Sequence, residues 1–160
     1  MSLLPLLSVA CGPVADTTID TVFDPCAPLV IDPAEPVSPA QRDSISDGIS
    51  MWNRIAGAAL TLGSPDLDDG DAPRIPVRFD DAGAFFHGLY DDEAGVVYVN
   101  DGIDDDHARS VTVAHELGHA FGLLHVNVDH DASVMNDGNL KTEPNDYDVD
   151  QLAAMWGHCQ

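Results

Sequence analysis

Basic residues are scarce in this sequence. Lys and Arg together number 6 in 160 residues, against 28 Asp and Glu, so the formal net charge at pH 7 is −22 with His counted as neutral. A surface this acidic repels nucleic-acid phosphates and anionic lipid headgroups. We therefore expect no nucleic-acid partner, and contact with a membrane only through a lipid anchor.

Long apolar runs are also missing. No stretch reaches the roughly 18 consecutive apolar residues that a membrane-spanning helix needs. Hydrophobic residues nevertheless make up 44% of the chain and charged residues 21%, which is the balance of a folded globular protein rather than a disordered one. The length suits one domain, which we place at residues 29–160, after a linker at 12–28.

Only three cysteines are present, an odd number. Residues 1–10 are apolar and small and lead into Cys11, so residues 1–11 are similar to a secretory signal or to the lipobox of bacterial lipoproteins, in which the Cys is lipidated. If Cys11 carries a lipid, Cys26 and Cys159 remain as a candidate disulfide; the alternative is three free thiols. The N-terminal pattern predicts export, so we expect an extracellular or cell-envelope protein.

Local sequence signals predict a mixture of helices and strands. Ser38 as N-cap, Pro39 in the first turn and Gln41 for a capping box mark one helix start. Helices are expected at 38–59, 106–122 and 146–157, the last capped by Asp146, and strands at 29–31, 60–62, 75–79, 86–90 and 96–100. This mixture predicts an α+β fold.

The most informative pattern lies at the end of the second expected helix and reads His115-Glu116-x-x-His119-x-x-Gly122-x-x-His125. A spacing of four residues places His115 and His119 about 40° apart on a helix, so that both imidazoles can reach one metal ion. An unbroken helix would aim His125 elsewhere. Gly122 can adopt a positive φ and end the helix, which lets the chain turn back and bring His125 to the same point.

This pattern points to zinc chemistry. Three neutral imidazoles suit Zn²⁺ and leave a fourth position for water or substrate, as in catalytic sites. Zinc lowers the pKa of bound water to about 7, and a neighbouring carboxylate can accept its proton. Glu116 directly follows the first ligand, so we expect it to be the general base and then to protonate the leaving amine.

The signature resembles the zinc-binding motif of the metzincin metalloproteases. The order of elements over roughly residues 29–157 is similar to that of the matrixins and of small bacterial enzymes without a recognisable pro-domain. The resemblance implies an α+β zincin fold with a small twisted mixed sheet, a long N-terminal helix, an active-site helix and a C-terminal helix. It also implies a methionine-containing turn beneath the metal, with Met135 as a supporting residue and not a ligand.

The same resemblance implies how substrate binds. An edge strand from residues 86–100 would pair with the substrate backbone, and residues 136–144 would form part of the S1′ wall. We expect a monomeric zinc endopeptidase acting on protein or peptide substrates. The first alternative is an acidic, surface-anchored binding protein that keeps the fold without hydrolysis.

A second alternative is a structural zinc site with Cys26, Cys159 or an Asp as the fourth ligand. The abundant carboxylates additionally make a structural Ca²⁺ conceivable, at 66–71, 80–81 or 101–105.

Overall fold

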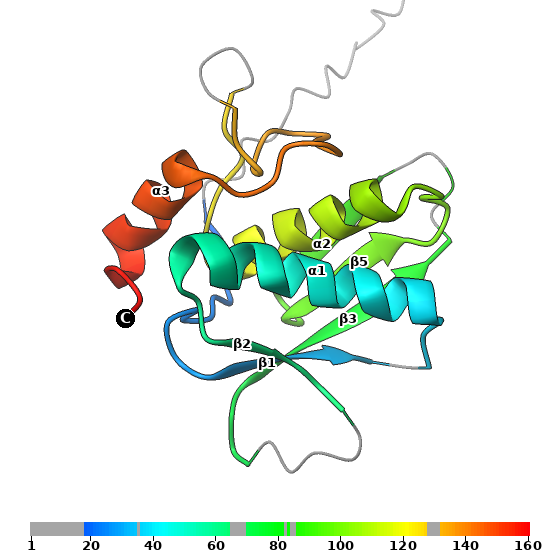
Figure 1. Ribbon diagram of the computed structural model, residues 1–160, viewed down its shortest axis with the longest axis horizontal. Coiled ribbons are helices and arrows are strands. Elements are labelled where there is room, and N and C mark those ends of the chain that lie inside the picture. Colours follow the sequence, from blue (N-terminus) through cyan, green and yellow to red (C-terminus); the bar gives the residue numbers. More distant parts are fainter. Residues whose placement is uncertain (1–17, 35, 65–69, 82, 84–85, 128–131) are drawn as a thin grey trace, which may run out of the picture.

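The fold is described from a computed structural model, which places residues 18–34, 36–64, 70–81, 83, 86–127 and 132–160 (Figure 1). The chain forms five strands and three helices in these ranges. The strands are β1 (Leu29–Pro33), β2 (Leu60–Leu62), β3 (Arg74–Asp80), β4 (Gly88–Asp91) and β5 (Val96–Asn100), and the helices are α1 (Pro39–Ala56), α2 (Asp106–Ala120) and α3 (Asp146–Trp156). The predicted mixture of helix and strand is confirmed.

The strands form one mostly parallel sheet in the order β2-β1-β3-β5-β4. The pairs β1–β2, β1–β3 and β3–β5 are parallel, while β4 and β5 form an antiparallel hairpin, with Tyr90 opposite Val97. β4 is therefore an edge strand, and none of the strands in the described residues pairs with its outer side.

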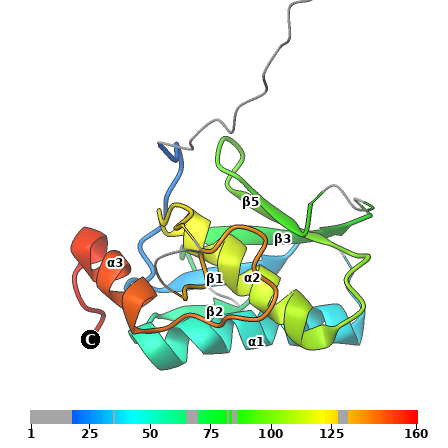
Figure 2. The same cartoon turned by 90° about the horizontal axis from the view of Figure 1, so that it is seen from above.

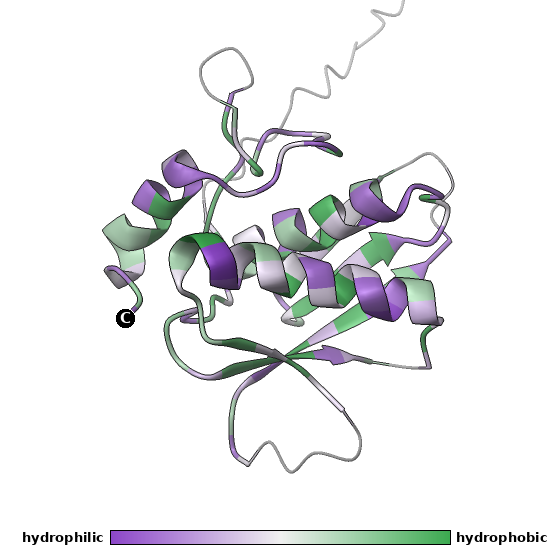
Figure 3. Ribbon diagram, in the orientation of Figure 1, coloured by the Kyte–Doolittle hydropathy of each residue, from purple (hydrophilic) through white to green (hydrophobic). Residues whose placement is uncertain are grey.

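Helices α1 and α2 pack against each other on one face of the sheet, and α3 lies beyond their ends (Figures 1 and 2). Gly48 permits the close approach of α1 to α2, because a Cβ at this position would lie 2.7 Å from Cγ1 of Val113. Trp52 is fully buried between the two helices and donates from Nε1 to the carbonyl of Ala114, at 2.8 Å. Apolar residues line the inner faces of the helices and the strands (Figure 3).

The helix ends follow their local signals, with two small differences from the prediction. Ser38 forms the expected capping box with Gln41, but α1 ends at Ala56 because Gly57 adopts a left-handed φ of 67°. The prediction that Asp146 caps α3 is wrong. Asn145 is the N-cap, because its side chain accepts the N–H of Tyr147, and Asp146 is the first helical residue.

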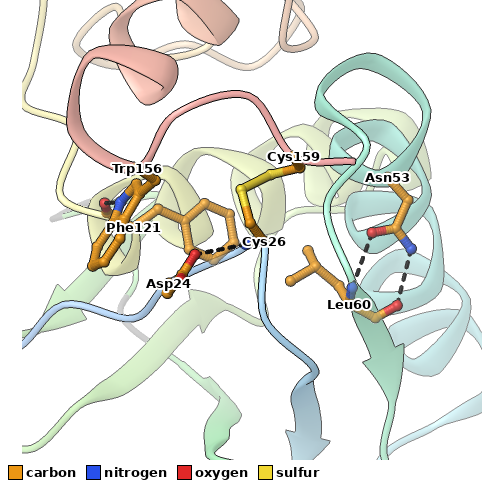
Figure 4. The surroundings of a disulfide bond; sticks show 7 residues. All are labelled: Asp24, Cys26, Asn53, Leu60, Phe121, Trp156 and Cys159. Atoms are coloured by element: carbon orange, nitrogen blue, oxygen red, sulfur yellow. Dashed lines mark hydrogen bonds between the residues drawn. A yellow bond between two sulfur atoms is a disulfide. The ribbon is translucent and has the colours of Figure 1, made fainter.

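A disulfide joins the two ends of the described chain. Cys26 and Cys159 are bonded, with their Cα atoms 4.8 Å apart and a sequence separation of 133 (Figure 4). The pairing fastens the segment after α3 to the segment before β1. Nearby, Trp156 of α3 donates from Nε1 to the carbonyl of Phe121, at 2.8 Å. Residues 1–11, including the candidate lipidation site Cys11, lie outside the described residues.

None of the described helices combines the length and the apolar character needed to cross a bilayer.

Candidate metal centre

Helix α2 carries most of the candidate site and is almost entirely buried. Asp105 caps its first turn by accepting the N–H of Ala108 at 2.7 Å. From Ala108 onward the helix is buried between the sheet and α1, so the side chains near its C-terminal end are held in place by packing. His115, Glu116 and His119 lie in this buried part, with exposed fractions of only 6%, 4% and 8%.

The turn after α2 brings the third histidine back to the first two. The helix ends at Ala120, Gly122 has a φ of 99°, and the N–H of Leu123 bonds to the carbonyl of Gly118 at 2.9 Å. A positive φ of this size is strained for a residue with a Cβ, so glycine is required here. The chain reverses as the spacing predicts, and His125 faces the end of the helix.

The three imidazoles converge on one point. Nε2 of His125 lies 3.1 Å from Nε2 of His115 and 3.0 Å from Nε2 of His119. Among the described residues, this is the only group of three or more His, Cys, Asp or Glu side chains whose ligand atoms approach one another closely enough to hold a metal ion, all within 4.8 Å. The three histidines thus form a potential metal site.

Hydrogen bonds fix the tautomers of the two buried histidines. Nδ1 of His115 lies 2.6 Å from the carbonyl oxygen of Val134, and Nδ1 of His119 lies 2.8 Å from that of Leu123. A carbonyl can only accept, so each Nδ1 must carry the proton, and each Nε2 then presents a lone pair to the convergence point. Such second hydrogen bonds are typical of metal-binding histidines.

The protonation state also fits a cation. Burial lowers the pKa of His115 to about 4 and that of His119 to about 3, and for His119 the neighbouring His115 and His125 lower it further. Both imidazoles are therefore neutral at pH 7 and available as ligands. Nitrogen lone pairs that face one another are stabilised by a metal ion between them, so the residues present fit a divalent metal with nitrogen preference.

Glu116 lies next to this site under the edge strand. Burial raises the pKa of its carboxyl group to about 8, and a hydrogen bond from the backbone N–H of Tyr90 opposes that effect. The strand can approach so closely because residue 88 is glycine: a Cβ on Gly88 would lie 2.5 Å from Oε1 of Glu116 and 2.7 Å from Cγ2 of Thr112. A bound cation would favour the charged carboxylate.

A cavity of about 390 Å³ opens over the histidines and Glu116. Strand β4 and the segment after Met135 both contribute to its walls. Outside α2 and His125, the lining residues are Ile19, Phe86, His87, Gly88, Leu89, Tyr90, Asp92, Asp137, Gly138 and Asn139. The cavity therefore combines the potential metal site, a buried carboxyl group and an open sheet edge.

The segment 132–142, here called the Met135 loop, packs against α2 and contacts His115. Met135 is 1% exposed, and its sulfur packs against Gly118 of α2, between the positions of the two buried histidines. The loop is tied to the chain after His125 by the bond from Val126 N–H to the Met135 carbonyl, at 3.0 Å. Met135 is thus buried against the helix that carries His115 and His119.

The remaining histidines, whose spacing in the sequence offers no second zinc site, do not join the metal group. His87 lines the cavity but is not in that group, and His107 and His158 are exposed. His130 and most of the candidate calcium loop at 66–71 lie outside the described residues. The carboxylates at 80–81 and 101–105 form no further metal group among the residues that the structure places.

Three residues of the site were missed by the sequence analysis. Tyr90 and Gly88 contact Glu116 from β4, and Asp148 of α3 binds the Met135 loop. Only Asp148 had a local signal, since Asn145 and Asp148 have the spacing of a capping box. That signal marks a helix start and says nothing about the loop.

Two comparisons with known proteins complete this description. No model of a known protein family matches the chain, and a search of curated proteins gave no match either.

Proposed function

We propose that the protein is a zinc-dependent endopeptidase of the metzincin type. The observation that carries this proposal is the convergence of three imidazole Nε2 atoms beside the buried carboxyl group of Glu116, in a cavity bordered by an edge strand. The spacing of the histidines, the turn at Gly122 and the buried position of Met135 support the assignment to metzincins.

The three histidines would hold one zinc ion and leave a coordination position open, which is the composition of a catalytic site. When bound, zinc supplies Lewis acidity, which lowers the pKa of a water molecule and polarises a carbonyl oxygen. A structural zinc with a thiolate ligand is disfavoured, because Cys26 and Cys159 are bonded to each other.

Glu116 would act as the proton carrier. Its carboxylate would accept a proton from the attacking water and return it to the nitrogen of the leaving amine. The buried position next to the histidines suits both roles, because a carboxyl group in an apolar environment holds a proton more readily than one in water. The Tyr90 N–H would keep the carboxylate oriented between the two transfers.

Strand β4 would bind the substrate backbone by adding the peptide as a further strand. Leu89 and Phe86 expose 51% and 36% of their surface beside this edge and would contact substrate side chains. Asp137, Gly138 and Asn139 would form the wall of the S1′ side. The disulfide supports export to an oxidising compartment.

The test is cleavage of an unfolded protein substrate by the purified chain with zinc, alongside Glu116→Ala and a chelator-treated sample. We expect cleavage by the wild type only, with zinc still bound by Glu116→Ala. Cleavage that survives in Glu116→Ala would contradict the role of this residue. Zinc binding without cleavage by either form would favour the non-hydrolytic binding protein instead.

A further inference from the structure

Helix α3 contributes a buried carboxylate, that of Asp148, which binds the Met135 loop. Asp148 is 1% exposed, and within the described residues it forms no ion pair with a Lys or Arg. The charge of Asp148 is instead stabilised by hydrogen-bond donors and by the positive end of the α3 dipole, because Asp148 lies in the first turn of that helix. The proposed zinc chemistry does not use this group.

Asp148 binds the Met135 loop and the start of α3 at once. Oδ2 accepts the N–H of Val134 at 3.1 Å and that of Asn145 at 3.0 Å. Oδ1 accepts the hydroxyl of Ser133, which is itself fully buried. One carboxylate therefore fixes the loop relative to the helix.

The Ser133 hydroxyl continues this contact toward the histidines. Its Oγ accepts the N–H of Met135 at 2.8 Å, and the carbonyl of the same peptide group, that of Val134, accepts Nδ1–H of His115 at 2.6 Å. The bonds thus run in one direction, from His115 through a peptide group and a hydroxyl to the carboxylate. Asn139 also donates to the Val134 carbonyl, at 3.1 Å.

A chain of hydrogen bonds with one direction polarises along its length. The negative charge on Asp148 draws the Ser133 proton toward itself, which makes Oγ a better acceptor and makes the Val134 oxygen more negative. A stronger acceptor at Nδ1–H makes the Nε2 of the imidazole more basic, as a carboxylate does when it binds a metal-binding histidine directly.

We propose that Asp148 is a positioning residue that strengthens metal binding by His115 through Ser133 and the Val134–Met135 peptide group. This inference rests on the metal site of the proposed function. It adds a charged residue on α3, remote from the cavity, to the groups that determine how firmly the site holds its ion.

Two substitutions interrupt the series of hydrogen bonds from His115 to Asp148 at different places. Asp148→Asn removes the charge with little change in volume, and Ser133→Ala removes the hydroxyl but leaves the bonds from Asp148 to Val134 and Asn145. We expect each to weaken zinc binding by about tenfold, the lower end for lost outer hydrogen bonds of metal ligands. If Asp148→Asn fails to fold, Ser133→Ala carries the test.

The matched control is Trp156→Phe, which removes a different anchor of α3, the bond to the Phe121 carbonyl. This variant should lower stability and leave zinc affinity unchanged. Affinity is measured on the full chain by competition with a chromophoric chelator. The ¹⁵N chemical shifts of His115 in the zinc-loaded chain provide a second readout, and they should move in the first two variants and not in the control.

The outcomes separate the two proposals. Wild-type affinity in both folded variants, or an equal loss in Trp156→Phe, would overturn the role of Asp148 and leave the peptidase proposal intact. A wild-type chain that binds no zinc would overturn both.

Discussion

The two walls of the cavity are held in different ways. On one side, α2 and residues 133–135 are buried, and their polar groups are tied to one another, as the bonds of His115 to Val134 and of Val134 to Asp148 illustrate. The wall made by β4 is a sheet edge with exposed apolar side chains. The comparison shows that the two buried histidines are held by packing and hydrogen bonds, while β4 is a sheet edge with apolar side chains exposed beside the cavity.

The largest effect should come from removing a ligand on the buried wall. His119→Ala should weaken zinc binding by more than the roughly 100-fold that loss of an outer hydrogen bond can cause, and should abolish peptide cleavage. Both are measured with chelator competition and a quenched peptide substrate. His107→Ala, on the exposed first turn of the same helix, is the control. Unchanged zinc affinity in His119→Ala would show that the metal binds elsewhere.

Gly88→Ala tests the close contact between β4 and Glu116 of α2. The added methyl group would press on Oε1 of Glu116, so kcat should fall by about 100-fold, the effect of a displacement near 1 Å, while zinc affinity stays constant. Gly102→Ala is a matched control, because its methyl group would lie 3.1 Å from Oδ1 of Asn100, outside the cavity. A loss of zinc binding in Gly88→Ala would show that the position of β4 also affects the three histidines, which would contradict this prediction.

Leu89→Ala should act on substrate binding alone. Its side chain is 51% exposed beside the edge of β4, so burial against a peptide would contribute about 1 kcal/mol. We expect KM to rise by about fivefold with kcat unchanged, in steady-state kinetics with a long peptide. A fall in kcat at constant KM would assign Leu89 to the chemical step instead.

The last prediction concerns the stability of the fold at alkaline pH rather than zinc or substrate binding. Burial, with the charges of Asp92 and Asp91, raises the pKa of Tyr90 to about 12 from its usual value of 10, and the hydroxyl donates to the Thr21 carbonyl at 2.8 Å. The folded state then binds the proton more tightly than the unfolded state. This stabilisation is complete below pH 10 and is lost as the pH rises toward 12.

Urea unfolding of the wild type and Tyr90→Phe between pH 9 and about pH 12 would show the effect. The stability of the wild type should fall more steeply with pH than that of the variant, which has no phenol to ionise. Parallel curves would mean that Tyr90 titrates normally and that the contact with Thr21 adds little.

The helix ends and the histidine spacing were predictable because they depend on interactions between residues that are close in sequence. The capping box at Ser38 and the positive φ at Gly122 follow from residues close in sequence, and the spacing of His115 and His119 depends on helix geometry alone. These signals were enough to predict the elements and the convergence of the three histidines.

The long-range features could not be read in the same way. β1 lies between β2 and β3, and no local pattern determines that order. The contact of Gly88 with Glu116 depends on that packing, as does the contact of Asp148 with Ser133. Glycine and aspartate are also common in turns and at helix starts, so their roles here had no distinct sequence signal.

The disulfide has a consequence if the proposed peptidase activity extends to the protein's own chain. Cys26 and Cys159 make the segment between them a covalent ring, which encloses the histidines and both cavity walls. A single cut anywhere in that ring leaves both fragments joined, so a self-cleaved molecule keeps its mass on a non-reducing gel, apart from one added water. Only reduction would separate the fragments, and the protein could therefore tolerate one internal cut without losing any part of itself.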